Sequence, residues 1–189
     1  MELSNVKTLK QYAAASLAIT VEDAKAQCFI VPEDTTQDSY LERLILTAQN
    51  IIENDPTIPY VFFKTQFAAL YSSDRPRMLL PKSPVLSLDS VAEFDGEKWN
   101  ILDNSQYTLE TGDRLDFAVL KTPPAARTQI KIEFTAGNET AETIPLGIKQ
   151  TVAALVSHLY EYRGLTTTQT LANSPVYNAI VGSLRRTSF

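Results

Sequence analysis

The stretch Ser39-Tyr40-Leu41-Glu42-Arg43-Leu44-Ile45-Leu46-Thr47-Ala48 carries the clearest structural signal in the sequence. Five apolar residues in it and just beyond it follow helical spacing: Leu41, Leu44, Ile45, Ala48 and Ile52. This spacing places them on one face of an amphipathic helix. Ser39 and Glu42 have capping-box spacing, which predicts that the helix begins at Ser39. Asp55-Pro56 predicts its end, because proline disfavours helical backbone in the residue before it.

An earlier helix is predicted after Thr20, which precedes a run of good helix formers. Thr20 is a suitable N-cap, and Asp23 places a negative charge in the first turn, where it favours the helix dipole. Pro32 predicts the end of this helix.

Two more helices are predicted near the C-terminus. Pro145 suits a first helical turn, and Gly164 is a natural stop. The apolar face between them consists of Ile148, Val152, Leu155, Val156 and Leu159. Ser174-Pro175 predicts the start of a last short helix.

Between these helices the sequence changes to strand-like patterns. Phe63–Phe67 and Ile130–Phe134 lean toward alternation of apolar and polar residues, which is typical of half-buried strands. Asp95-Gly96 predicts a tight hairpin turn, since glycine supplies the positive φ of a type I′ turn. Thr111-Gly112-Asp113 predicts a second hairpin before Leu115-Asp116-Phe117.

The order of these elements predicts an α+β fold. Helices come from both ends of the chain and form a small antiparallel bundle, with a block of antiparallel strands inserted between them. The predicted parts are an N-terminal arm (1–19), a helical body (20–58 and 144–164), a β-rich insertion (59–143) and a C-terminal tail (165–189).

Composition excludes several classes of protein. The chain has 189 residues, one histidine, one cysteine and a net charge of −5. The single Cys28 cannot form an intrachain disulfide and excludes a multi-cysteine zinc site. The excess of acids disfavours general nucleic-acid binding, because phosphate contacts need lysine and arginine. No apolar stretch approaches the roughly 20 residues that span a membrane.

The sequence contains no convincing catalytic constellation. The glycines form neither of the two common phosphate-binding motifs, and no GxSxG is present. His158 has Glu161 one helical turn away, and Asp113 lies close to Asp116, but nothing else in the sequence supports a reaction at either pair. Cys28 is interpreted as a small core residue. We therefore predict no catalytic residue, no cofactor and no metal; a small metal- or His-dependent hydrolase is an alternative.

The charges are distributed unevenly. Residues 33–55 contain six acids and one base, whereas residues 164–189 contain two arginines and no acid. A short helix within the last segment is marginal alone and needs something to pack on. Its own core, a neighbouring subunit and another protein are all consistent with the pattern.

Three blocks together resemble the head-tail connector (adaptor) proteins of tailed bacteriophages, the group that includes the HK97 connector. The first is Thr20–Lys25, followed by Asp38 and the stretch from Leu41 to Glu53. The second is Leu80-Pro81-Lys82-Ser83-Pro84, continuing to Val91. The third is Ile132–Gly137, followed by Ile144-Pro145 and ending in Tyr160-Glu161-x-Arg163. Their order and spacing carry the resemblance, which covers about residues 20 to 165.

The resemblance implies a structural protein of the virion, located at the head-tail interface and assembled in the host bacterial cytoplasm. Copies would form a ring, a dodecamer, beneath the portal. The ring would extend the DNA channel without binding DNA specifically, and would join the portal to a stopper or tail-side protein. A monomeric regulatory binding module is the other alternative.

The resemblance also implies which residues meet partners. The tail would reach the portal through Val176, Tyr177, Ile180, Leu184, Arg185, Arg186 and Phe189. An acidic surface would line the channel or a subunit contact through Glu33, Asp34, Asp38 and Glu42.

Overall fold

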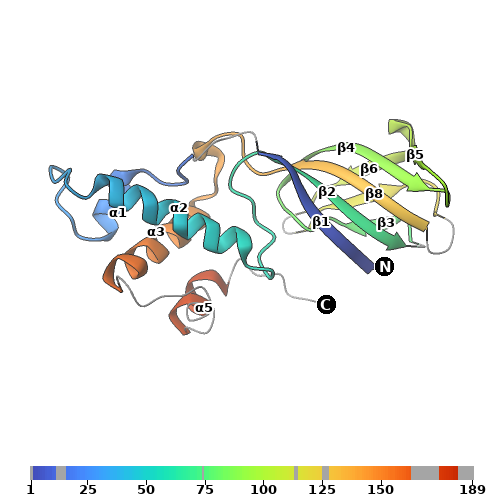
Figure 1. The fold of residues 1–189 in the computed structure, drawn as a ribbon. Coiled ribbons are helices and arrows are strands. Elements are labelled where there is room, and N and C mark those ends of the chain that lie inside the picture. Colours follow the sequence, from blue (N-terminus) through green and yellow to red (C-terminus); the bar gives the residue numbers. More distant parts are fainter. Residues whose placement is uncertain are drawn as a thin grey trace. The chain divides into compact units, whose positions relative to one another are not determined.

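The computed structural model describes residues 2–11, 16–73, 75–112, 115–124, 128–162 and 175–182 (Figure 1). The chain divides into two compact units. One, the β unit, comprises Met1–Ala14 and Phe63–Asn138; the other, the helical unit, comprises Ala15–Phe62 and Glu139–Phe189. The fold is α+β, which confirms the prediction from the sequence. In the described part of the chain, no helix combines the length and the hydropathy needed to cross a bilayer.

The helical unit contains four described α-helices and one 3₁₀ turn: α1 (Val21–Gln27), α2 (Asp38–Asn54), η2 (Ala141–Thr143), α3 (Leu146–Glu161) and α5 (Pro175–Val181). α1 and α2 pack on α3, and α5 contacts α3 as well. All ten apolar residues predicted on the faces of α2 and α3 are buried. Each buried leucine, isoleucine or valine side chain stabilises the unit by about 1.5–3 kcal/mol, so these two faces hold the bundle together.

The ends of the helices agree with the predictions in part. Thr20 and Asp23 form a complete capping box at the start of α1, and α2 ends before Asp55, as predicted. The predicted start of α2 at Ser39 is wrong, because the helix begins at Asp38 and its N-cap, Gln37, makes no side-chain capping hydrogen bond. The predicted end of α1 at Pro32 is also wrong, because the backbone already leaves the helix at Cys28.

The β unit contains two antiparallel sheets. The larger has the order β1-β2-β8-β4-β5, and the smaller has the order β3-β7-β6. The strands of the larger sheet are β1 (Glu2–Gln11), β2 (Thr65–Ser73), β8 (Thr128–Ala136), β4 (Val85–Phe94) and β5 (Trp99–Ile101). Those of the smaller sheet are β3 (Arg77–Leu79), β7 (Phe117–Leu120) and β6 (Tyr107–Glu110), the last preceded by the 3₁₀ turn η1 (Asn104–Gln106).

The core of the β unit lies on one face of the larger sheet. Alternate residues of β8 are buried, and Phe134 stacks on Phe67 of β2 with ring centroids 5.6 Å apart. Met78, Ala118 and Leu120 of the smaller sheet are buried too. This period of two follows from the strand pleat, which sends successive side chains to opposite faces.

Both predicted hairpins are present with a changed register. Phe94 pairs with Trp99, so the first loop holds four residues, Asp95–Lys98, instead of two. Gly96 has the expected positive φ of 102°. In the second hairpin Glu110 pairs with Phe117, so Leu115 and Asp116 precede the strand; Asp113 lies outside the described residues.

Candidate assembly surfaces

The loop after α1, residues 28–37, presents apolar side chains to solvent. Phe29 is 97% exposed and Val31 is 63% exposed. The amide of Ile30 donates to the carbonyl of Lys25 at 2.9 Å, and the amide of Phe29 donates to that of Ala26 at 3.3 Å. These two bonds form a Schellman motif, in which the residue after the C-cap adopts left-handed backbone and is usually glycine. Phe29 occupies that position with φ 57°.

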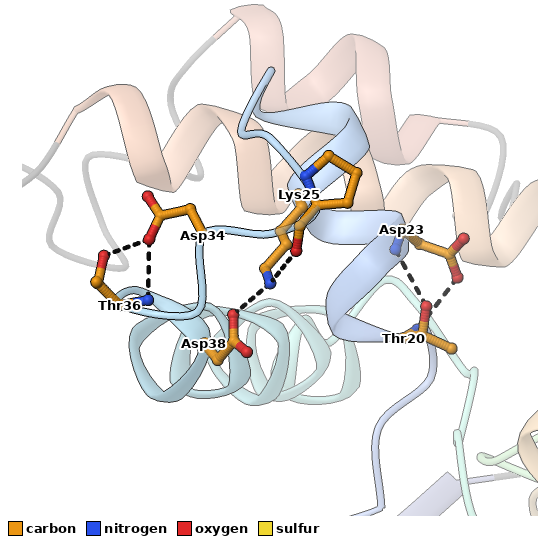
Figure 2. Close-up of polar contacts among 7 residues, drawn as sticks. Thr20, Asp23, Lys25, Asp34, Thr36 and Asp38 are labelled. Carbon is orange, nitrogen blue, oxygen red and sulfur yellow. Dashed lines mark hydrogen bonds and ion pairs between the residues drawn. The ribbon is translucent and has the colours of Figure 1, made fainter.

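Lys25 holds this loop in place. Lys25 is only 3% exposed, and its Nζ donates to the carbonyl oxygen of Pro32 at 3.1 Å. The same Nζ lies 2.7 Å from Oδ1 of Asp38, at the start of α2. Figure 2 shows the lysine side chain reaching from α1 to Asp38. A buried ammonium needs such partners, because desolvation of an unpaired charge is costly. Lys25 therefore holds the middle of this loop, at Pro32, and the start of the helix that follows it, at Asp38.

The four acids predicted for an assembly surface lie in this loop and on α2. Glu33 and Glu42 are exposed. Asp34 accepts hydrogen bonds from the hydroxyl and the amide of Thr36, which hold the pKa of its carboxyl below the ordinary value of 3.8. Asp38 is engaged by Lys25, so its charge is locally balanced. Glu33, Asp34 and Glu42 therefore carry the free negative charge of this surface.

The acidity of the whole chain belongs to the helical unit. Counted over the sequence, this unit has eleven acidic and six basic residues, a net charge of −5, which is the net charge of the chain. The β unit has eleven of each and is neutral. Three of the six bases of the helical unit, Arg163, Arg185 and Arg186, lie after α3.

The described part of the C-terminal tail is packed on its own chain. Tyr177 is 2% exposed, Val181 is fully buried, and the hydroxyl of Tyr177 donates to Oδ2 of Asp55 at 3.0 Å. The same aspartate, through Oδ1, accepts from the amide and hydroxyl of Thr57. The side chains of Val176 and Ile180, and all of Leu184, Arg185, Arg186 and Phe189, lie outside the described residues. The structure thus places Tyr177 as the anchor of α5.

The residues weighed for catalysis have structural surroundings. His158 is half-buried on α3 and packs against the ring of Tyr162, with centroids 4.8 Å apart. Asp116, weighed in the sequence together with Asp113, is buried. Its Oδ2 accepts from the hydroxyl of Ser83 at 2.8 Å and from the amide of Val85 at 3.1 Å. Asp116 thereby ties the start of β4 to the smaller sheet.

Cys28 is the C-cap of α1 and is half-buried, so the interpretation as a core residue is only partly met. Among the residues that the structure describes, no group of three or more histidine, cysteine, aspartate or glutamate side chains is arranged to hold a metal ion.

Sequence reasoning missed two features of these surfaces. The left-handed Phe29 was missed because its usual signal is a glycine at that position. Strand β1 was missed because residues 2–11 do not alternate clearly.

The chain thus combines a helical unit with an inserted antiparallel β unit. The model of the family described as head completion protein matches residues 18–177, so the chain belongs to this family. It is a structural protein of the head-tail connector type and not an enzyme. Comparison with curated proteins gave no match.

Three solved structures share the fold over nearly the whole chain. A chain from the neck of an empty gene transfer agent particle, computed with C6 symmetry, aligns with TM-score 0.68 and 17% identity, over 100% of this chain and 97% of that one. A chain from the virion of the native gene transfer agent particle aligns with TM-score 0.69 and 16% identity, over 95% of this chain and 96% of that one. A chain from the neck of the native particle, computed with C12 symmetry, aligns with TM-score 0.61 and 18% identity, over 100% of this chain and 97% of that one. At these identities the likeness establishes the fold.

Proposed function

We propose that this chain is a head-tail adaptor, located at the neck of a tailed phage or phage-like particle, where it joins the portal to a stopper or tail-side protein. The observation that carries the proposal is the family match over residues 18–177 together with a shared fold that spans the chain. The proteins that share the fold come from necks and virions of gene transfer agent particles.

We further propose that twelve copies form a ring. The support is the C12 symmetry applied to one of the neck structures that share this fold. A closed ring needs heterologous contacts, in which one surface of each copy meets a different surface of the next. The exposed loop that carries Phe29 and Val31 is one surface suited to contact a neighbouring component, because exposed apolar groups gain most from being covered.

The acidic surface suits the wall of a DNA channel. Glu33, Asp34 and Glu42 carry free charge in a unit whose net charge is −5. Like charge keeps DNA phosphates from adhering to a wall past which DNA must slide. In this proposal DNA passes through the ring without specific binding.

The end of the tail is proposed to bind the portal. α5 is anchored to its own unit by Tyr177, so the contact is assigned to the residues beyond it, Leu184, Arg185, Arg186 and Phe189. These residues combine two positive charges with two apolar side chains, and residues 164–189 contain no acid. Such a segment suits an acidic partner with apolar recesses.

Binding to purified portal rings tests this function. The chain is mixed with the portal of the same particle, and sedimentation and electron microscopy record whether a second ring forms. A truncation that removes residues 183–189 but keeps α5 should lose most of the binding. Tyr177→Phe, which keeps the buried ring, should bind normally. A truncated chain that binds as well as the full chain would exclude the tail contact; a full chain that never joins the portal would exclude the adaptor function.

A further inference from the structure

The two edges of the larger sheet are different strands, and each edge strand pairs with another strand of the sheet on one side only. β1 ends the sheet on one side and β5 ends it on the other (Figure 1). An edge strand presents a row of main-chain donors and acceptors that can pair with another strand. Each copy of the chain therefore carries two unlike edges, which is the arrangement that a head-to-tail contact requires.

Both edges expose apolar side chains. All three residues of β5 are exposed, and Ile101 is 77% exposed. Trp99 lies on the same face of β5, supported by the ring of Phe94 at a centroid distance of 5.2 Å. On β1, Leu9 is 43% exposed, and Lys7 and Thr8 are exposed beside it. Burying these apolar groups would favour contact between the two edges.

The charges of the two edges are opposite. The segment of β1, residues 2–11, contains Lys7 and Lys10 against one acid, a net charge of +1. The segment around β5, residues 93–103, contains four acids against Lys98, a net charge of −3. The opposite charges favour pairing of a β1 edge with a β5 edge. Two β5 edges carry like charge, which disfavours their pairing.

We propose that β1 of one copy pairs with β5 of the next copy, so that neighbouring β units share one continuous sheet around the ring. This inference rests on the proposed ring. The four strand pairings of the sheet are all antiparallel, so β1 and β5 of one copy run in the same direction. If neighbouring copies keep that direction, the new pairing is parallel.

The proposed contact between β1 and β5 is short, because few residues of either strand can pair. β1 is regular only between two irregularities in its pairing with β2, over the four residues Asn5–Thr8, and β5 has three residues. Short edges and bulges limit unwanted pairing of free chains. The contact is therefore expected to be weak between two copies and to persist only in a ring, where each copy is held on both sides.

Cysteine cross-linking tests the proposal on portal-bound rings. In a chain with Cys28→Ser, Lys7→Cys or Leu9→Cys is combined with Ile101→Cys. Mild oxidation should give a ladder of covalent multimers that extends to the full ring. The matched control replaces Ile101→Cys by Thr108→Cys, an exposed position in β6 of the smaller sheet, and should give no ladder.

The outcomes separate this proposal from the proposed function. Rings seen by electron microscopy whose subunits cross-link in neither combination would overturn the pairing of β1 with β5 and leave the adaptor function intact. A chain that binds the portal without forming rings would overturn both the ring and the edge pairing. Ile101→Asp gives a second readout: ring formation should require roughly tenfold more protein, a loss of about 1.4 kcal/mol, whereas Thr108→Asp should not change it.

Discussion

The Nζ atom of Lys25 lies 2.7 Å from Oδ1 of Asp38, but the two side chains have unequal access to water. The lysine side chain is 4% exposed and the aspartate side chain is 36% exposed. The paired Oδ1 of Asp38 is buried, but the rest of the aspartate side chain reaches water, whereas almost none of the lysine side chain does. The two partners are therefore not equivalent in what their loss does to the helical unit.

We expect Asp38→Ala to destabilise the helical unit more than Lys25→Met. Removing the carboxylate leaves a buried ammonium with Pro32 as its remaining partner, at a cost of about 1–3 kcal/mol. Methionine fills the volume of the lysine stem and leaves a half-exposed aspartate, which costs less. Urea unfolding followed by circular dichroism measures both values, and equal losses in the two variants would contradict the argument from unequal exposure.

Gly137→Ala should be far more damaging than Gly96→Ala. Both glycines have positive φ, 108° and 102°, so alanine is strained at either position by about 1–3 kcal/mol. At Gly137 a Cβ would also lie 2.4 Å from the carbonyl oxygen of Phe63, whereas at Gly96 it meets nothing within 4 Å. Thermal unfolding of the two variants compares the steric cost directly, with Gly96→Ala as the control for backbone strain.

Local signals in the sequence were sufficient for the apolar faces of the helices and for the start of α1, although not for the start of α2 or the end of α1. The predicted N-cap Thr20 and the predicted apolar faces of α2 and α3 are each set by residues of a single helix and its cap, and all of them are present. The hairpin at Gly96 was also predictable, although its loop is two residues longer than expected.

Features that depend on distant residues were not predictable. β1 exists because it pairs with β2, where Leu3 lies opposite Tyr71. Asp116 is buried, and Ser83, 33 residues away, donates a hydrogen bond to its carboxylate. The hydroxyl of Tyr177 donates to Asp55, 122 residues earlier in the chain. No local pattern in a single sequence specifies such pairs.

Asp95 gives the β4–β5 hairpin a predictable pH dependence. Hydrogen bonds from the amides of Lys98 and Glu97 and from the side chain of Asn100 hold the pKa of this carboxyl below its ordinary value of 3.8. A lowered pKa in the folded state stabilises the hairpin above pH 3.8, and this contribution is lost as the pH falls through the lowered value. Carboxyl NMR titration should give a midpoint below 3.8 for Asp95, and a midpoint above it would contradict these hydrogen bonds.

Tyr177 should fix α5 through its ring more than through its hydroxyl. Tyr177→Phe removes one hydrogen bond to Asp55 and should cost about 1–2 kcal/mol. Tyr177→Ala also empties a buried site and should cost about 3–5 kcal/mol. Hydrogen exchange of the α5 amides measures the difference: they should stay protected in the phenylalanine variant and lose protection in the alanine variant. Unchanged protection in both would show that the other contacts of α5 are sufficient.

Phe29 is expected to lower stability and to favour assembly. Its backbone is left-handed and its side chain is 97% exposed, so within its own chain it adds strain without burial. Phe29→Gly should raise the free energy of unfolding by up to about 1 kcal/mol, because glycine adopts this conformation without a Cβ clash. If the aromatic side chain of Phe29 is covered in the assembly, the same variant should also weaken formation of the protein ring on the portal.

Phe29→Ala separates the two effects. Alanine keeps most of the backbone strain and removes the aromatic side chain, so stability should stay close to that of the natural protein while assembly falls as in the glycine variant. Urea unfolding and portal-dependent ring formation are measured on the same preparations. If both variants form rings at the same protein concentration as the unsubstituted chain, the side chain of Phe29 makes no contact in the assembly. If only the glycine variant loses assembly, the left-handed turn matters through its rigidity and not through the exposed ring.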